Sequence, residues 1–241
     1  MDDLWSGLTL DMLRHRVVTL VGGGGKTTTL YALARRARDA GKTVIVTTTT
    51  HIMPHPGIFV TGDGTKEALR SALDRHGIVT LGKLDRTDKM GGTGCIAVCK
   101  ELSDLVLVEG DGARMHPLKV PAGHEPVIPP ESDAVIAVAG LRALDGAIGR
   151  VCHRAERVAA LLGKTPCDLI TEEDIAAILL SLAGGRKGVR GTMAFRCLLN
   201  QADTPELQAR GARIARNLER AGVPTRVQHY VEKERGGRCW F

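Results

Sequence analysis

The chain of 241 residues is poor in aromatic side chains, and it has neither a long apolar run nor a dense set of cysteines. Aromatics make up 3% of it, which argues against the stacked platforms on which proteins hold single-stranded nucleic acid. No stretch approaches the ~20 apolar residues that span a bilayer, and residues 1–5 do not resemble a basic and apolar leader. Six scattered cysteines form no disulfide scaffold. We therefore expect a cytoplasmic protein with reduced thiols and no membrane partner.

The composition is that of an ordinary globular protein, since 43% of the residues are hydrophobic and 25% are charged. The formal net charge is +6, and many basic residues lie late in the chain. Such a set indicates either an acidic partner or a solvated helix face and tail. We favour the solvated surface, because no nucleic-acid-binding motif accompanies it, and we do not expect nucleic acid as a partner. The residues are Arg186, Lys187, Arg190, Arg196, Arg210, Arg213, Arg216, Arg220, Lys233, Arg235 and Arg238.

Apolar runs and helical patterns alternate along the whole sequence. The predicted strands cover residues 17–21, 43–47, 58–61, 78–81, 105–108, 134–139, 194–199 and 226–231. The predicted helices cover residues 30–40, 66–76, 153–162, 172–182 and 205–221. This alternation predicts a single three-layer α/β domain over residues 1–241, with a mostly parallel sheet and helices on both faces. Irregular insert loops are expected near residues 82–95, 112–130 and 184–191, where glycine, proline and charged residues gather.

A glycine-rich turn joins the first predicted strand to the first helix, and it continues into Lys26 and Thr27. Glycines let backbone N–H groups converge on anionic oxygens, and the helix directs its positive end to the same place. The lysine of such a loop reaches the β- and γ-phosphates, and the threonine hydroxyl ligates Mg²⁺. We therefore expect the phosphates of GTP or ATP to be held by Gly22, Gly23, Gly24, Gly25, Lys26, Thr27 and Thr28. Leu20 stands where a full G-x-x-x-x-G-K-[ST] loop has its first glycine, so the shorter pattern is as similar to Mur-type ligases as to GTPases.

Two carboxylates, Glu109 and Asp111, come directly after the buried strand predicted at residues 105–108. Ligands of an open parallel sheet lie outside the carboxyl ends of its strands. The pair resembles a Walker-B element, in which a carboxylate completes a Mg²⁺ site or orients an attacking water. We predict catalytic and metal-binding roles for both, with Thr27 as the third metal residue.

Two further strand ends carry candidate contacts to the nucleotide. His51 follows a threonine-rich strand end and is a candidate phosphate or substrate contact. Asn200 and Asp203 resemble the Asn-Lys-x-Asp element by which GTPases recognise guanine, although Gln201 replaces the lysine. The alternative is a polar turn that caps the helix beginning near Pro205. We favour base recognition, which predicts that GTP competes better than ATP.

Five prolines between residues 117 and 130 exclude regular structure and predict a rigid loop. Arg114, Lys119, His124 and Glu125 lie in or beside this loop, and these residue types suit an anionic second substrate and proton transfer. A purely structural loop is the alternative. Cys95 and Cys99 have the spacing of one helix face, but without a second Cys or His pair we expect them to be structural.

Several of these runs, in the same order, resemble the YqeC family of selenium-dependent hydroxylase accessory proteins, also called selenium cofactor biosynthesis proteins. The resemblance is carried by residues 22–29, 47–51, 108–114, 117–121, 124–129, 152–154 and 200–203. It implies a P-loop NTPase-like fold and a part in maturing selenium-containing molybdenum hydroxylases. It also implies a molybdenum-cofactor intermediate or the hydroxylase apo-protein as partner. Because of this resemblance we add His153 and Arg154 to the candidate site residues.

The leading hypothesis is a Mg²⁺-dependent nucleoside-triphosphate-binding protein that acts as an NTPase or NTP-dependent transferase in this maturation. In this hypothesis Lys26, Glu109, Asp111, His124 and Glu125 are catalytic. One alternative is a maturation chaperone that nucleotide binding switches without a chemical substrate. Another is a Mur-like ligase or kinase that acts on a small anionic substrate.

Overall fold

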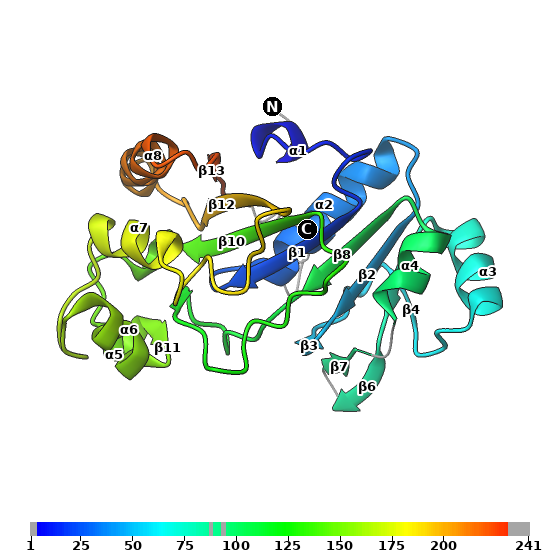
Figure 1. The fold of residues 1–241 in the computed structure, drawn as a ribbon, viewed down its shortest axis with the longest axis horizontal. Helices are drawn as coiled ribbons and strands as arrows, with labels where there is room; N and C mark the ends of the chain where they lie inside the picture. The colour runs from blue at the N-terminus through cyan, green and yellow to red at the C-terminus, as the bar shows by residue number, and fades with distance from the viewer. Residues whose placement is uncertain (1–3, 87–88, 93–94, 231–241) are drawn as a thin grey trace.

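A single eight-stranded sheet forms the centre of the computed structural model, which describes residues 4–86, 89–92 and 95–230 (Figure 1). All neighbouring strands in this sheet are parallel. In order across the sheet they are β13 (Thr225–Val227), β12 (Ala194–Asn200), β10 (Ala134–Gly140), β1 (Val17–Gly22), β8 (Leu105–Glu109), β2 (Val44–Thr48), β5 (Ile78–Leu81) and β4 (Phe59–Thr61). The predicted α/β class with a mostly parallel sheet is confirmed, and the arrangement is compatible with a P-loop NTPase-like fold.

Alternate residues of the strands enter hydrophobic cores on opposite faces of the sheet. Val18 and Leu20 of β1 pack in the core beneath α1 (Leu4–Gly7) and α2 (Lys26–Asp39). Val17 and Val21 enter the cores of the other face. That face is covered by α3 (Lys66–His76), α4 (Ile96–Leu102), α7 (Glu172–Leu180) and α8 (Pro205–Arg220). Because both faces are buried, the central strands are apolar at almost every position, and three layers result.

A second, antiparallel sheet of three short strands occupies part of the segment that was expected to be an irregular loop at 82–95. It joins β3 (His51–Ile52), β7 (Lys89–Gly91) and β6 (Lys83–Arg86) in that order. A Cβ on Gly92 would lie 2.0 Å from the Thr48 carbonyl oxygen, so glycine lets this sheet approach the end of β2. Within residues 112–130 the structure has one short strand, β9 (Leu118–Lys119), and residues 184–191 form turns.

The predicted elements differ from the observed ones mainly at their ends, whereas the helices α1, α4 and α5 (Ile148–Val151) were not predicted. The helix expected from residue 153 begins later, as α6 (Ala155–Leu162), because β11 (Cys152–His153) pairs with β9 and Arg154 is left-handed with φ 62°. Before it lie η1 (Leu141–Ala143) and α5. The last strand is shorter than predicted, and Val231 lies outside the described residues, as do Lys233, Arg235, Arg238 and Cys239.

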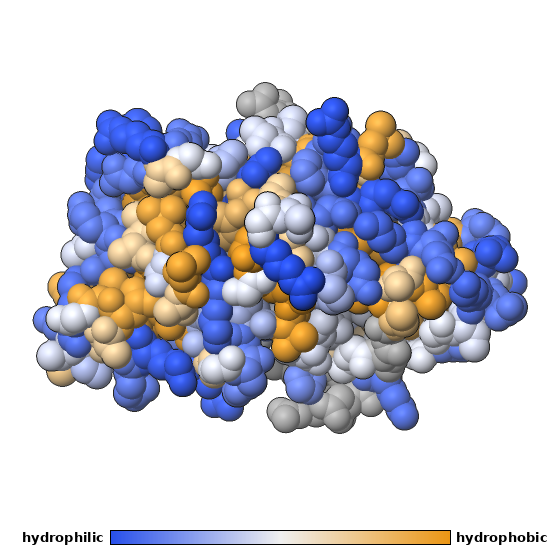
Figure 2. Space-filling model, viewed as in Figure 1, coloured by the Kyte–Doolittle hydropathy of each residue, from blue (hydrophilic) through white to orange (hydrophobic). Residues whose placement is uncertain are grey.

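Hydrophilic residues cover most of the face seen in Figure 2, and hydrophobic residues gather in patches mainly over its left half. Two of the late basic residues, Arg210 and Arg213 of α8, form ion pairs with Glu172 at the start of α7. The charges of these two arginines are therefore matched within the protein. Across the described ranges, no helix has the length and apolarity needed to cross a membrane.

Candidate phosphate-binding site

The glycine turn lies between the end of β1 and the start of α2, and other segments pack closely against it. Gly22, Gly24 and Gly25 have left-handed φ angles of 98°, 77° and 109°. A Cβ on Gly23 would lie 2.7 Å from the His116 carbonyl oxygen, and one on Gly24 would lie 2.4 Å from the Gly140 nitrogen. Glycine is therefore required here by backbone conformation and by close approach of two other segments.

The N–H groups of this turn fall into two sets. Gly22 donates to Asp111 Oδ1 at 3.1 Å, and the Gly23 and Gly24 N–H groups donate to the carbonyl oxygens of Val138 and His116. By contrast, the N–H groups of residues 25–28 have no acceptor within the described part of the chain. They are the open donors of the first turn of α2, where the helix dipole also favours an anion. An anion would thus meet residues 25–28, whereas the expected backbone contacts of Gly22, Gly23 and Gly24 are already used by protein acceptors.

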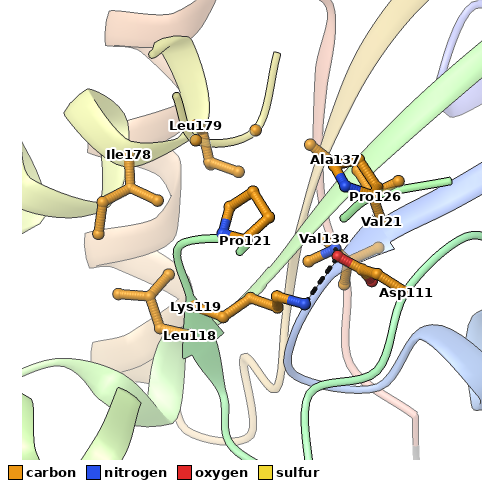
Figure 3. Close-up of a pocket in the computed structure, with 13 residues that line it drawn as sticks. Val21, Asp111, Leu118, Lys119, Pro121, Pro126, Ala137, Val138, Ile178 and Leu179 are labelled. Atoms are coloured by element: carbon orange, nitrogen blue, oxygen red, sulfur yellow. Dashed lines mark hydrogen bonds and ion pairs between the residues drawn. The ribbon is translucent and has the colours of Figure 1, made fainter. Parts of the chain in front are cut away.

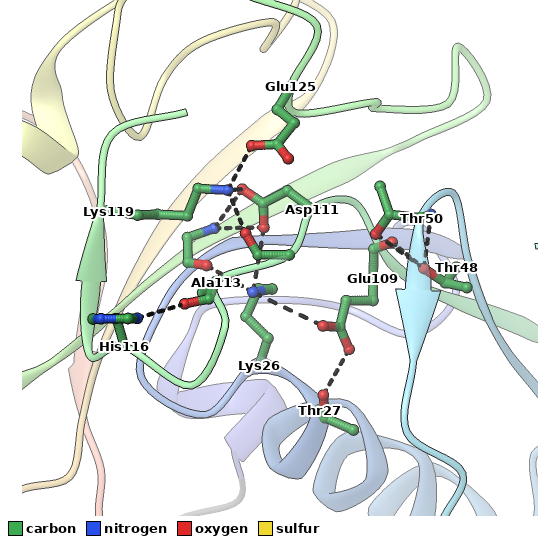
Figure 4. A network of polar contacts seen from close by, with 12 residues as sticks. Lys26, Thr27, Thr48, Thr50, Glu109, Asp111, Ala113, His116, Lys119 and Glu125 are labelled. Carbon is green, nitrogen blue, oxygen red and sulfur yellow. Dashed lines mark hydrogen bonds and ion pairs between the residues drawn. The ribbon is translucent and has the colours of Figure 1, made fainter. Parts of the chain in front are cut away.

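Lys26 and Thr27 face the acidic end of β8 (Figure 4). The Lys26 Nζ donates to the Gly22 carbonyl at 2.6 Å, and it lies 3.3 Å from Asp111 Oδ1 and 3.9 Å from Glu109 Oε1. The Thr27 hydroxyl donates to Glu109 Oε2 at 2.7 Å. The ammonium group is therefore held by two carboxylates at the position from which it would turn toward a bound phosphate.

Thr27 and Glu109 suit Mg²⁺ in the way expected of a nucleotide site. Mg²⁺ usually takes one or two carboxylates and completes its shell with waters and substrate phosphates. In the described portion of the chain, no group of three or more His, Cys, Asp or Glu could hold a metal by itself. Asp111, the other carboxylate predicted to bind the metal, is 1% exposed and does not line the pocket. Its oxygens instead bind the Gly22 N–H, Lys26 and Lys119, so it holds the loop in place.

Lys119 is buried and joins Asp111 to the 112–130 loop. Its Nζ donates to the Gly112 carbonyl at 2.6 Å and forms ion pairs with Asp111 Oδ2 at 3.0 Å and Glu125 Oε2 at 2.9 Å. This ammonium group lies beside the mostly apolar side chains of a small cavity (Figure 3). The cavity volume is about 10 Å³, which is the size of one water molecule. The side chain is 0% exposed, so the predicted contact of Lys119 with a second substrate is replaced by a structural role.

A chain of alternating charges results, because Glu125 also binds Arg154, with 3.0 Å between Oε1 and Nη2. The consecutive members are Glu109, Lys26, Asp111, Lys119, Glu125 and Arg154. Burial raises the pKa of Glu125, but hydrogen bonds and charge from Lys119 and Arg154 outweigh it and lower this pKa to about 2. Burial, with the charges of Arg154 and Lys119, lowers the pKa of His153 to about 4. At neutral pH the site therefore holds an ionised Glu125 and a neutral His153.

A pocket of about 790 Å³ opens above these groups. It brings together most of the predicted site residues, namely Gly24, Gly25, Lys26, Thr27, Thr28, His51, Glu109, Arg114, His124 and Glu125. The volume lies in the upper part of the range for small-molecule sites, about 300 to 1,000 Å³. Room therefore exists for more than a phosphate chain.

The predicted base-recognition residues lie elsewhere. Asn200 is buried, and its Nδ2 donates to the Gly24 carbonyl at 2.8 Å, so it holds the glycine turn. Asp203 Oδ2 accepts from Arg142 Nε at 2.6 Å. Neither residue lines the pocket, whereas Gln201 between them does.

The pocket also has walls that sequence reasoning did not assign. Thr49, Thr50, Met53, His116 and Val127 line it. The threonines looked like ordinary strand residues, and their position beyond the end of β2 was the only signal. His153 and Arg154 were found through the family resemblance alone, because their approach depends on the β9–β11 pairing.

Comparisons with known proteins bear on this site. The family model described as YqeC protein matches residues 18–156. The chain is also 32% identical over 195 residues to a protein of Escherichia coli (strain K12) named "Uncharacterized protein YqeC", and the match covers 76% of this chain and 76% of that protein. The family match includes the glycine turn and every member of the charge chain, whereas Asn200 lies beyond it.

Proposed function

This chain belongs to the YqeC family, and from its phosphate site we propose that it is a Mg²⁺-dependent protein that binds and hydrolyses a nucleoside triphosphate. The observation that carries the proposal is the set of four open N–H groups at residues 25–28, beside Lys26 and Thr27. Such a set at the start of a 14-residue helix suits the phosphates of ATP or GTP.

Each residue of the site has a distinct role in this proposal. The N–H groups of residues 25–28 bind the phosphates, and Lys26 turns from Asp111 toward them. Thr27 and Glu109 hold Mg²⁺, which neutralises phosphate charge when bound. Asp111 and Lys119 keep the glycine turn and the 112–130 loop in register.

We further propose that this activity serves the maturation of selenium-dependent molybdenum hydroxylases, with a molybdenum-cofactor intermediate or the apo-hydroxylase as partner. The support is the family resemblance of the sequence runs around the site. The size of the pocket favours an NTP-dependent transferase, ligase or kinase as a second candidate, since the cavity extends well beyond the glycine turn.

The test is nucleotide binding and turnover by the purified protein with and without Lys26→Ala. We expect Mg²⁺ with ATP or GTP to raise the unfolding temperature of the native protein, and saturation at 100 times Kd corresponds to about 2.7 kcal/mol. The Lys26→Ala variant should lose this shift and the release of phosphate, because it lacks the cation that faces the β- and γ-phosphates.

Lys66→Ala is the matched control, since Lys66 is an exposed lysine whose Nζ pairs with Glu101 on the surface. Thr27→Ala is a second variant, and it leaves all members of the charge chain in place. We expect that Mg²⁺ no longer increases the nucleotide-induced shift of the unfolding temperature in this variant. The proposal fails if neither nucleotide shifts the unfolding temperature of the native protein.

A further inference from the structure

Unusual backbone conformations gather at this one pocket. Among the described residues, six that are not glycine have positive φ angles. Four of the six line the pocket, namely Arg114, Met115, Arg154 and Gln201. Each left-handed residue with a side chain costs about 1 to 2 kcal/mol, and such strain concentrates at functional sites. The wall that carries Arg114 and Arg154 is therefore a place to look for a second ligand.

The guanidinium group of Arg154 has N–H donors that no residue of the described chain uses. It is the N-cap of α6, and its left-handed φ of 62° precedes the helix. Its Nη2 donates to Glu125, while its buried Nε has no acceptor in the described part of the chain. The buried Nε does not reach the pocket, but the Nη N–H groups that Glu125 leaves unused can still bind an oxyanion.

Arg114 adds a second, exposed guanidinium group to the same pocket. Its side chain has no hydrogen bond or ion pair with any residue that the structure describes. The turn that carries it is held by the His116 N–H, which donates to the Ala113 carbonyl at 3.0 Å. With φ angles of 46° and 66° at Arg114 and Met115, this turn is kept in a strained form that presents the arginine.

Two imidazole rings extend the same wall. The rings of His116 and His153 lie with their centres 5.9 Å apart, and both residues line the pocket. The His116 Nδ1 lies 3.1 Å from the Arg114 carbonyl oxygen, so this ring helps to hold the turn. The neutral His153 ring carries one donor and one acceptor and can orient an anion or its neighbouring hydroxyl group. Glu125 is the acidic residue of this wall, and its two oxygens are already bound by Lys119 and Arg154.

From this geometry we infer a second anion subsite in the pocket, in which Arg154 and Arg114 bind the phosphate or carboxylate group of a small-molecule substrate. The inference rests on the proposed function, because a second substrate explains why a nucleotide pocket has this additional basic wall. The charge chain connects the two subsites, since Asp111 and Lys119 separate Lys26 from Glu125 and Arg154.

The test is titration of inorganic phosphate, and separately of acetate, into protein saturated with Mg²⁺ and a non-hydrolysable ATP or GTP analogue. The analogue fills the glycine turn, so a remaining anion site is reported by calorimetry. We expect at least one anion to bind, and we expect Arg154→Ala to weaken it about tenfold or more. Arg114→Ala should weaken it too, and the preferred anion distinguishes a phosphate site from a carboxylate site.

Arg157→Ala is the matched control, because Arg157 is exposed on α6, three residues after Arg154, and its loss changes the net charge equally. If Arg154→Ala does not fold, Arg154→Lys keeps the charge but not the fork, and Arg114→Ala remains a test at an exposed position. Absence of binding, or equal binding by native, Arg154→Ala and Arg114→Ala proteins, overturns the inference.

The two proposals fail in different ways. If the analogue binds and neither anion does, the subsite is wrong and nucleotide binding stands. If the analogue does not bind, the nucleotide proposal fails, and the titration is repeated on nucleotide-free protein. Phosphate binding that survives Lys26→Ala and is lost in Arg154→Ala then supports the subsite alone, and any other pattern overturns it.

Discussion

At the scale of single residues, the central feature is the charge chain, in which positive and negative side chains alternate in space from Glu109 to Arg154. An isolated buried charge is costly, and removing one partner of a buried pair typically costs about 3 to 5 kcal/mol. Lys119 is 0% exposed and is flanked by Asp111 and Glu125, so its charge is matched on both sides. The same two contacts join the glycine turn to the proline-rich loop.

Glu125 makes the charge chain sensitive to acid. Its pKa of about 2 in the folded protein lies below the ordinary value of 4.5, so it stabilises the fold above about pH 4.5. That contribution is lost as the pH falls from about 4.5 toward 2, where the carboxylate takes up a proton. We expect Glu125→Gln to flatten the decline in the free energy of unfolding over this range, measured by urea denaturation.

Glu156→Gln is the control for this measurement, since Glu156 is an exposed acid at the start of α6. Its pH profile should follow that of the native protein. Parallel profiles for Glu125→Gln and the native protein would contradict the assigned contacts of Glu125 with Lys119 and Arg154.

At the scale of elements, the strand, glycine turn and helix form one unit whose shape depends on its neighbours. The turn needs left-handed angles, which the glycines supply locally. It also needs space, because β10 and the 112–130 loop approach it to within van der Waals contact. Local conformation and tertiary packing therefore both select glycine at these positions.

Gly24 and Gly41 separate the two effects, because both have φ of 77° but only Gly24 is crowded. Gly41→Ala should cost about 1 to 2 kcal/mol of stability from backbone strain alone. Gly24→Ala should cost clearly more, since its Cβ would lie 2.4 Å from the Gly140 nitrogen. Denaturant unfolding of the two variants measures the difference, and equal losses would show that the turn can move aside.

At the scale of the whole molecule, residues far apart in sequence complete the site. Asn200, at the end of β12, donates to the Gly24 carbonyl across 176 positions of sequence. In this position it supports the glycine turn, for which we propose binding of the phosphate groups that ATP and GTP share. The hydrogen bond links the C-terminal part of the sheet to the glycine turn.

Asn200→Ala is therefore expected to weaken ATP and GTP binding by the same factor, measured by calorimetry on the purified variant. A loss confined to GTP would instead mean that Asn200 contacts the base. Asp203→Asn tests the separate expectation that GTP binds better than ATP because Asp203 contacts the base. If Asp203 reads guanine, this change should lower GTP affinity alone.

Much of the fold could be predicted because its signals are local. Continuous apolar runs, helical periodicity and the glycine turn before Lys26 and Thr27 each depend on residues within a few positions of one another. They predicted the α/β class and the mostly parallel sheet, which the structure confirms. They also predicted the place where we propose that phosphates bind. The start of α6 and the short β3–β7–β6 sheet were missed, because they depend on pairing between distant segments.

The sequence by itself determined which residue types would meet at the carboxyl ends of the strands. The tertiary structure decided what each of them does there. In it the N–H groups of Gly22, Gly23 and Gly24 donate to protein acceptors, whereas those of residues 25–28 have no acceptor in the described part of the chain. It also buried Lys119 between two carboxylates and placed Arg154 against Glu125. The physical reason is that partners in a hydrogen bond or ion pair are chosen by distance in space, which a pattern along the chain does not specify.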